Sequence, residues 1–171
     1  FKGCPLRCLW CCNPESQRPE PEPGYHPEKC FGCGRCVARC SRGVLALKED
    51  RTLNISRGVC KGECPDCAKV CPDKALAWYG KPYTVAEVMH VVEQDALFYT
   101  RSGGGLSVSG GEPLMQPAFL LELLEEARRR RINTALESCA CVPEATFLSV
   151  MPHVDYLMVD IKHMDDETHK R

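Results

Sequence analysis

The chain has 171 residues, enough for one hydrophobic core of ordinary size or for a core and a small second unit. Its formal net charge is −1, and no apolar run approaches the roughly 18 residues of a membrane span, so neither nucleic acid nor a membrane is a predicted partner. The 14 cysteines are unusual. Eleven of them fall into three close sets, which indicates metal binding in a reducing cytoplasm rather than the disulfides of a secreted chain.

The first set is Cys4, Cys8 and Cys11, at the spacing C-x3-C-x2-C with the aromatic Trp10 before the third cysteine. Neighbouring cysteines on one loop cannot bridge each other without strain, whereas thiolates select zinc, copper(I) or iron–sulfur clusters. The set offers three ligands and no obvious fourth, and an open coordination position is typical of a catalytic site. A zinc knuckle with the same spacing is the alternative.

The stretches on either side of this set predict less regular structure. Phe1-Lys2-Gly3 is expected to be the end of a buried strand that is cut, and we interpret the sequence as a fragment. Residues 13–29 are rich in Pro and Glu, which excludes a helix or a central strand and predicts a linker.

Two sets of four cysteines follow within residues 28–75, and the second set ends in Cys-Pro. In the bacterial ferredoxin run C-x2-C-x2-C-x3-C-P, the fourth cysteine ligates the other cluster. This rule predicts one 4Fe–4S cluster on Cys30, Cys33, Cys36 and Cys71, and a second on Cys60, Cys64, Cys67 and Cys40, with a small hairpin between Gly43 and Ile55. Ser41 after Cys40 and the three-residue spacer after Cys60 depart from the run and leave the partner of Cys60 open. Two zinc ions are the alternative.

The remaining residues alternate between helix and strand patterns. Thr84 to Glu87 is a capping box, and it opens an apolar helix stripe that ends at 102–105. Further helices are predicted from Pro117 and over 143–151, and strands over 106–109, 132–136 and 155–161. The stripe consists of Val85, Val88, Met89, Val92, Ala96 and Tyr99. This alternation predicts right-handed βαβ units and a parallel sheet.

Three polar segments follow the predicted strands. Gly110-Gly111-Glu112 ends the first strand, and its glycines allow close approach of a ligand while its carboxylate and carbonyls suit an ammonium group. Glu137-Ser138 and Met158-x-Asp160-x-Lys162 end the next two, at the edge where α/β sheets bind ligands. The alternatives are an ordinary turn and an exposed ion pair. The remaining cysteines, Cys12, Cys139 and Cys141, are expected to be small buried hydrophobes.

The run from Phe1 to Cys11, continued by Asn13-Pro14-Glu15-Ser16-Gln17, resembles the signature loop of radical S-adenosylmethionine enzymes. In its flanks it is similar to the glycyl-radical-enzyme activating enzymes, such as pyruvate formate-lyase activating enzyme, and the resemblance runs from Phe1 to about Lys170. It implies an α/β fold, a partial (β/α) barrel of six strands, truncated here to four including the one that ends at Phe1–Gly3. A ferredoxin-like α+β subdomain would interrupt the barrel, giving 1–27 as core and linker, 28–75 as the insert and 76–171 as the rest of the core.

The resemblance also implies roles for the candidate site residues. Cys4, Cys8 and Cys11 would hold a catalytic 4Fe–4S cluster whose open iron binds the methionine amino and carboxylate groups of S-adenosylmethionine. Gly110-Gly111-Glu112 would bind the amino group, Lys162 would face the carboxylate, and Trp10 with the backbone at Cys11 and Cys12 would lie against adenine. A monovalent cation is expected near Glu137, Ser138, Met158 and Asp160, although Glu137 stands where Asp is more usual.

The implied reaction is reductive cleavage of S-adenosylmethionine to a 5′-deoxyadenosyl radical, which takes a hydrogen atom from a backbone glycine of a partner enzyme. The implied cofactors are three 4Fe–4S clusters and S-adenosylmethionine, and the implied partners are a glycyl radical enzyme and a flavodoxin or ferredoxin reductant. As a fragment, the chain is expected to have an edge strand with unpaired backbone groups, and to have little or no activity.

Two other functions remain open from the sequence. A polyferredoxin-type electron carrier would use the eight insert cysteines, but it has no need of an open iron. Another radical S-adenosylmethionine enzyme, acting on a small molecule or a sulfatase, would typically carry its additional clusters after the barrel rather than inside it.

Overall fold

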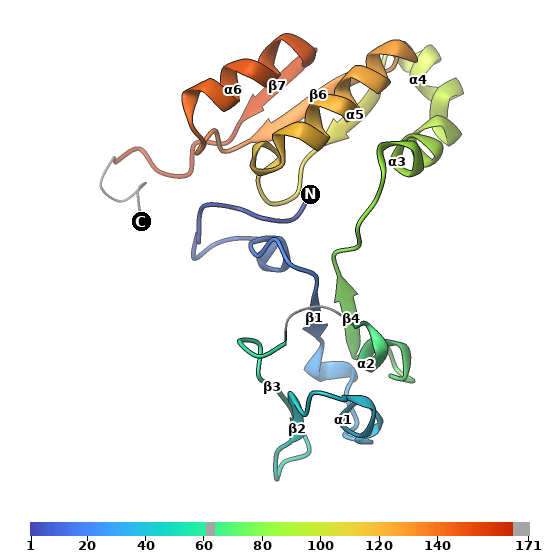
Figure 1. Ribbon diagram of the computed structural model, residues 1–171, viewed down its shortest axis with the longest axis vertical. Helices are drawn as coiled ribbons and strands as arrows, with labels where there is room; N and C mark the ends of the chain where they lie inside the picture. Colours follow the sequence, from blue (N-terminus) through green and yellow to red (C-terminus); the bar gives the residue numbers. More distant parts are fainter. Residues whose placement is uncertain (61–63, 166–171) are drawn as a thin grey trace. The chain divides into compact units, whose positions relative to one another are not determined.

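The computed structural model describes residues 1–60 and 64–165, and the chain divides into two compact units (Figure 1). The core unit consists of Phe1–Pro19 and Pro82–Arg171, and the insert unit consists of Glu20–Lys81. The predicted boundaries of the insert, residues 28 and 75, lie inside the insert unit. None of the described helices combines the length and the apolar character that crossing a bilayer requires.

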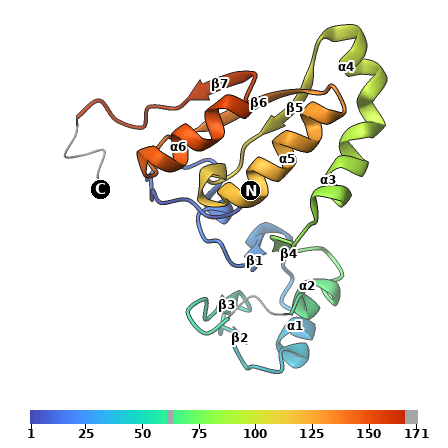
Figure 2. The same cartoon turned by 45° about the horizontal axis from the view of Figure 1, so that its top comes forward.

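The core unit contains a parallel sheet of three strands in the order β5-β6-β7. The strands are β5 (Gly105–Val108), β6 (Asn133–Ser138) and β7 (Tyr156–Val159). The connecting helices are α5 (Pro117–Arg129) and α6 (Glu144–Val150), which lie beside each other along the sheet in Figures 1 and 2. The predicted βαβ alternation and parallel pairing are confirmed, and the fold is mixed α/β.

The core of this unit forms where the helices pack on the sheet. Met89, Leu120, Leu124, Leu136 and Val150 are fully buried there. The predicted apolar stripe is split between α3 (Val85–Val92) and α4 (Ala96–Ser102), because a 3-10 turn over Glu93–Asp95 interrupts the helix. The poor helix former Asp95 lies at this junction.

The segment Phe1–Gly3 extends this sheet without forming a fourth strand. The Phe1 nitrogen donates to the Ser109 carbonyl at 2.9 Å, and the Gly111 N–H donates to the Phe1 carbonyl at 3.0 Å, which is the bonding pattern of a parallel pair. The next bond, from the Glu112 N–H to the Gly3 carbonyl at 2.7 Å, falls out of this register, because Gly3, with φ of 98°, turns the chain out of the extended conformation. The prediction of four strands is therefore wrong for the described residues, which contain three in this sheet.

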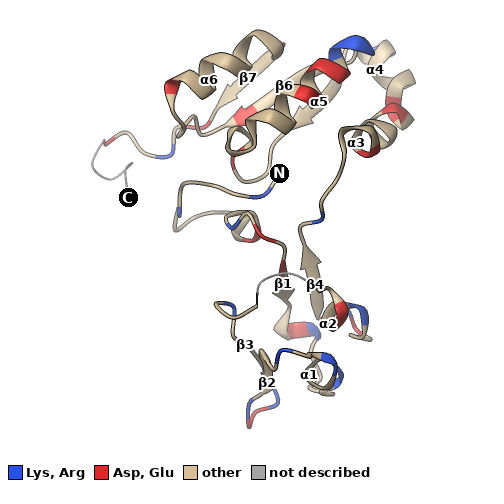
Figure 3. Cartoon of the chain, viewed as in Figure 1, with Lys and Arg blue, Asp and Glu red and all other residues tan. Residues whose placement is uncertain are grey.

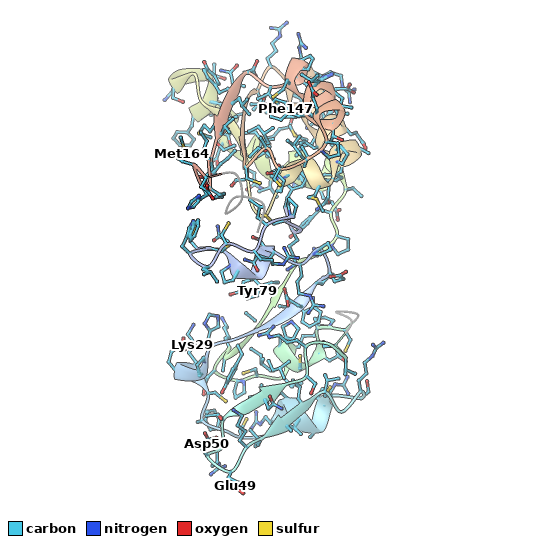
Figure 4. All side chains as sticks on the ribbon, turned by 90° about the vertical axis from the view of Figure 1, so that its left-hand side faces the viewer. Lys29, Glu49, Asp50, Tyr79, Phe147 and Met164 are labelled. Carbon is cyan, nitrogen blue, oxygen red and sulfur yellow. The ribbon has the colours of Figure 1, made fainter. Side chains whose placement is uncertain are left out.

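The insert unit contains two antiparallel pairs of strands and two short helices. Strand β1 (Glu22–Tyr25) pairs with β4 (Leu76–Tyr79), and β2 (Leu45–Leu47) pairs with β3 (Leu53–Ile55). The helices are α1 (Arg35–Arg39) and α2 (Asp66–Lys69). The β2–β3 pair is the hairpin predicted between Gly43 and Ile55, and Figure 4 shows Glu49 and Asp50 at its tip.

Strand β1 lies inside the stretch predicted to be a linker, so that prediction is wrong over Glu22–Tyr25. Pro23 is tolerated because the sheet has only two strands, and proline is compatible with an edge strand whose N–H is not needed for pairing. Short 3-10 turns over Pro14–Ser16 and Pro27–Lys29 occupy other parts of the same stretch.

The capping box of α3 is formed as predicted, and it gives a test of local stability. The Thr84 hydroxyl accepts from the Glu87 N–H at 3.2 Å, and the Glu87 carboxylate accepts from the Thr84 N–H at 2.8 Å. We expect Thr84→Ala to lower the free energy of unfolding by about 1 kcal/mol, because a helix-terminal donor loses its acceptor. Thr84→Ser keeps the hydroxyl and is the control. Equal losses for both variants in urea denaturation would show that the cap contributes nothing.

Candidate active site

The first cysteine set lies on an irregular loop, residues 4–11, which we call the cluster loop. Backbone bonds hold its start, since Gly3 N–H donates to the Ser16 carbonyl at 2.8 Å and Cys4 N–H donates to that of Gln17 at 3.0 Å. Leu6 is buried and anchors the loop, whereas Cys4, Cys8 and Cys11 are half-buried. The loop therefore has a fixed base and presents its three thiols beside a cavity.

This cavity of about 320 Å³ brings together most of the predicted site residues, all from the core unit. The predicted residues that line it are Cys4, Cys8, Trp10, Cys11, Cys12, Gly110, Gly111, Glu137, Ser138, Asp160 and Lys162. Lining residues that the sequence did not indicate are Leu6, Asn13, Ser16, Gln17, Ser109 and Cys139. Two predicted residues are not among the lining residues: Glu112 and Met158.

The parallel sheet explains why residues far apart in sequence meet here. Gly110 follows β5, Ser138 ends β6 and Asp160 follows β7, and the carboxyl ends of parallel strands share one edge of a sheet. The Asp160 N–H donates to the Ser138 carbonyl at 2.9 Å, which keeps β7 aligned with β6 up to the cavity.

The two glycines of the turn after β5 are required by close backbone packing. Gly110 has φ of 132°, and a Cβ atom there would lie 2.2 Å from the Phe1 carbonyl oxygen. A Cβ atom on Gly111 would lie 2.3 Å from the Gly3 oxygen and 2.6 Å from the Ser16 oxygen. The turn therefore lies directly against the base of the cluster loop, and any larger residue would separate them.

The Glu112 side chain points into the protein rather than into the cavity, and it is fully buried. One carboxylate oxygen accepts from the Leu114 N–H at 3.0 Å and from the Ser138 hydroxyl at 2.9 Å. The other accepts from the Cys139 N–H at 2.8 Å. Glu112 thus ties the end of β5 to the end of β6, a role that the sequence did not predict.

Charged and polar side chains meet at the edge of the cavity. Lys162 forms an ion pair with Asp160, and this hydrogen bond raises the pKa of the lysine although partial burial opposes the shift. The Ser109 hydroxyl donates to the Glu137 carboxylate at 2.7 Å. The cavity therefore offers one ammonium group, held in its charged form, beside two carboxylates.

The three unassigned cysteines differ in environment. Burial, followed by a hydrogen bond to Glu112, raises the pKa of Cys139 to about 12, so this thiol stays protonated. Cys12 is exposed and lines the cavity, whereas Cys141 is exposed and does not. The expectation of a small buried residue is therefore wrong for Cys12 and Cys141.

The insert unit gathers its eight cysteines into two groups, each around its own cavity. The first thiol set is Cys30, Cys33, Cys36 and Cys71, and the second is Cys40, Cys60, Cys64 and Cys67. These groups coincide with the ligand sets derived from the ferredoxin run, including the exchange of the last cysteine between the two halves.

The electrostatics of the thiols agree with this grouping. Burial and then the neighbouring Cys60, Cys64 and Cys40 raise the pKa of Cys67 to about 11. Burial also raises the pKa of Cys40, but the backbone N–H groups of residues 42–45 outweigh it and lower the pKa overall.

Cysteine thiolates are the ligands that hold 4Fe–4S clusters, so the donor type of these sets suits such clusters. Among residues 1–60 and 64–165, no three His, Cys, Asp or Glu side chains are placed to bind one metal ion.

Comparisons with known proteins agree with the chemistry of these donor sets. The model of a family described as a 4Fe-4S single cluster domain matches residues 51–164. An isethionate sulfite-lyase activating enzyme of Nitratidesulfovibrio vulgaris is 49% identical over 99% of this chain and 56% of its own length. A (2S)-3-sulfopropanediol sulfolyase activating enzyme of Bilophila wadsworthia is 44% identical over 100% of this chain and 57% of its own.

A third relative is named for a different substrate. An indoleacetate decarboxylase activating enzyme of Tractidigestivibacter scatoligenes is 41% identical over 100% of this chain and 56% of its own length. The chain thus spans little more than half the length of the curated relatives it matches. The resemblance to activating enzymes is confirmed, and the chain belongs to the family of 4Fe-4S single cluster domains.

Proposed function

We propose that this protein activates a glycyl radical enzyme by cleaving S-adenosylmethionine. The observation that carries the proposal is the cavity of the core unit, which the three thiols of the cluster loop line together with Gly110, Gly111 and Lys162. A pure electron carrier would need four ligands and no substrate cavity. The reaction class is that of pyruvate formate-lyase activating enzyme, and the fold is a partial radical S-adenosylmethionine barrel with a ferredoxin-like insert.

In this proposal Cys4, Cys8 and Cys11 hold a 4Fe–4S cluster that leaves one iron open. When bound, this cluster supplies the electron that cleaves S-adenosylmethionine into methionine and a 5′-deoxyadenosyl radical. The protein contributes orientation and exclusion of water. The rigid base of the cluster loop fixes the thiols, and the buried Glu112 fixes the turn that faces them.

The residues around the cavity bind the ends of the substrate. Backbone carbonyls at Gly110 and Gly111 accept from the amino group, which needs the close approach that only glycine permits. Lys162, kept charged by Asp160, attracts the methionine carboxylate. Trp10 and the backbone at Cys11 and Cys12 lie against adenine. A monovalent cation binds near Glu137, Ser138 and Asp160 at the cavity, with Met158 on the adjoining strand.

The insert unit holds two further 4Fe–4S clusters and accepts electrons from a flavodoxin or ferredoxin. It carries 11 Lys and Arg residues against 8 Asp and Glu residues, and Figure 3 shows basic residues along α1. An excess of positive charge favours association with an acidic carrier. The reaction takes place in the reducing cytoplasm, where such clusters survive.

The partner is a glycyl radical enzyme, whose backbone glycine gives up the hydrogen atom. Identity is higher to an isethionate sulfite-lyase activating enzyme, 49%, than to the sulfopropanediol or indoleacetate relatives, 44% and 41%. Isethionate sulfite-lyase is therefore the first partner to test.

The test is an anaerobic reconstitution of the full protein with iron and sulfide. We expect about twelve irons per chain, from three cubanes, and 5′-deoxyadenosine after addition of dithionite and S-adenosylmethionine. Adding isethionate sulfite-lyase should give the electron paramagnetic resonance signal of a glycyl radical. About eight irons with no nucleoside would overturn the proposal and favour an electron carrier. Nucleoside without a radical on any glycyl radical enzyme would favour a different substrate.

A further inference from the structure

The hairpin β2–β3 contacts the first thiol set through an arginine in its turn. In this turn the Lys48 N–H donates to the Thr52 carbonyl and the Arg51 N–H donates to the Lys48 carbonyl, each at 2.9 Å. Arg51 has φ of 64°, in the left-handed region that such turns usually give to glycine. Arginine is strained at this position, and strained residues are concentrated where the side chain has a function.

The Arg51 side chain packs on Gly32, which lies between Cys30 and Cys33 of the first thiol set. The guanidinium Nη2 donates to the Gly32 carbonyl at 3.2 Å. Gly32 is buried with φ of 71°, and a Cβ atom there would lie 2.7 Å from the Arg51 Cβ and 2.8 Å from the Arg51 carbonyl oxygen. The two residues therefore lie against each other so closely that Arg51 fixes the peptide group between Gly32 and Cys33.

The segment 31–34 carries backbone donors that the protein leaves unused. Its four residues line the cavity of the first thiol set, and their N–H groups donate to no oxygen acceptor among residues 1–60 and 64–165. Arg51 is not among the lining residues. In a planar trans peptide the carbonyl and the N–H point in opposite directions, so a Gly32 carbonyl held by Arg51 directs the Cys33 N–H away from the arginine. A backbone N–H without a partner beside these thiols suits the sulfurs of a bound cluster.

We propose that Arg51 is a positioning residue of the first thiol set, which holds the Gly32 carbonyl, turns the Cys33 N–H toward the sulfurs and raises the reduction potential of the cluster there. Reduction adds negative charge that spreads onto the sulfurs, and N–H donors stabilise the reduced form more than the oxidised form. The inference rests on the proposed function, because it requires a cluster at this set.

The test is a redox titration of the reconstituted full protein followed by electron paramagnetic resonance. Arg51→Gly removes the side chain, and glycine suits the left-handed turn, so the hairpin should be retained. We expect one reduction midpoint to shift to a more negative potential while the other two stay at their wild-type values and the iron content stays at about twelve. Cys67→Ala, which removes a ligand of the second set, assigns the shifted midpoint, because the shift caused by Arg51→Gly should persist in that background.

Loss of a positive charge would also lower a midpoint, so two comparisons separate charge from positioning. Lys48→Ala is the matched control, because Lys48 is an exposed cation of the same turn and its side chain makes no hydrogen bond with the segment 31–34. This variant should leave all three midpoints unchanged. Arg51 is also exposed, so its charge is screened in about 1 M salt, where the Debye length is about 3 Å. The shift caused by Arg51→Gly should persist there, because a hydrogen-bonded arrangement does not depend on screening.

The outcomes separate this inference from the proposed function. If the wild-type protein binds about twelve irons and Arg51→Gly leaves every midpoint unchanged, only the role of Arg51 is overturned. That role is also overturned if Lys48→Ala causes an equal shift, if salt abolishes the shift, or if Arg51→Gly loses about four irons, since the side chain would then hold the cluster rather than tune it. About eight irons with the shift but without 5′-deoxyadenosine would support the role of Arg51 and overturn the activase function. A wild-type protein with only about four irons would overturn both, because no insert cluster would exist.

Discussion

Replacing Glu112 by alanine should lower the free energy of unfolding of the core unit by about 3 kcal/mol or more. The substitution removes a fully buried carboxylate and leaves three donors without their acceptor: the Leu114 N–H, the Ser138 hydroxyl and the Cys139 N–H. Each buried donor left unsatisfied costs about 1–3 kcal/mol. The ends of β5 and β6 should also separate, which would displace Gly111 and Ser138 at the cavity.

Glu112→Gln removes only part of the hydrogen bonding that the Glu112 carboxylate provides. The amide oxygen can still accept from Leu114 and Ser138, but the amide nitrogen would face the Cys139 N–H, so one donor meets another. We expect an intermediate loss of stability together with weaker binding of S-adenosylmethionine, because the turn that carries Gly110 and Gly111 is no longer fixed. Chemical denaturation measures the first effect and equilibrium dialysis measures the second.

Glu122→Ala on α5 is the matched control, since this carboxylate is exposed. Its free energy of unfolding should stay within about 0.5 kcal/mol of the wild type. If Glu112→Ala were no more destabilising than this control, the carboxylate would not be engaged as the distances indicate, and its assignment as a positioning residue would be wrong.

The inward direction of the Glu112 side chain could not be predicted from the sequence. The motif Gly110-Gly111-Glu112 and its place after a strand were predictable, because strand and turn patterns are local. The partners of the carboxylate, Ser138 and Cys139, lie 26 and 27 residues later and come close only when β5 and β6 pair. From the sequence alone, the same carboxylate was expected to face the amino group of the ligand.

Strand β1 was missed for a related reason. It lies in a proline-rich stretch that indicates a linker, and it forms only because β4 pairs with it from the other end of the insert unit. Cysteine spacing, by contrast, was informative at long range. The ferredoxin run carries the exchange of Cys40 and Cys71 within its own pattern, and the structure groups the thiols in the same two sets.

The largest effect on activity is expected at the cluster loop. Alanine at Cys4, Cys8 or Cys11 should remove about four of about twelve irons and reduce 5′-deoxyadenosine formation to the level of a protein-free control. Two remaining thiols of the cluster loop cannot hold a cubane beside an open iron, and Cys139, which also lines the cavity, has its pKa raised to about 12 by burial and by Glu112. The insert clusters should remain, because their ligands belong to a separate unit.

Cys141→Ala is the control for these three variants, because Cys141 is exposed, lies outside the cavity and belongs to no thiol set. It should keep the full iron content and the wild-type nucleoside yield. The electron paramagnetic resonance spectrum of the reduced protein gives a second measurement: S-adenosylmethionine should change the wild-type and Cys141→Ala spectra but not that of Cys8→Ala. If the Cys8→Ala spectrum still responded to S-adenosylmethionine, the substrate would bind at an insert cluster. The three thiols of the cluster loop would then not form the catalytic centre.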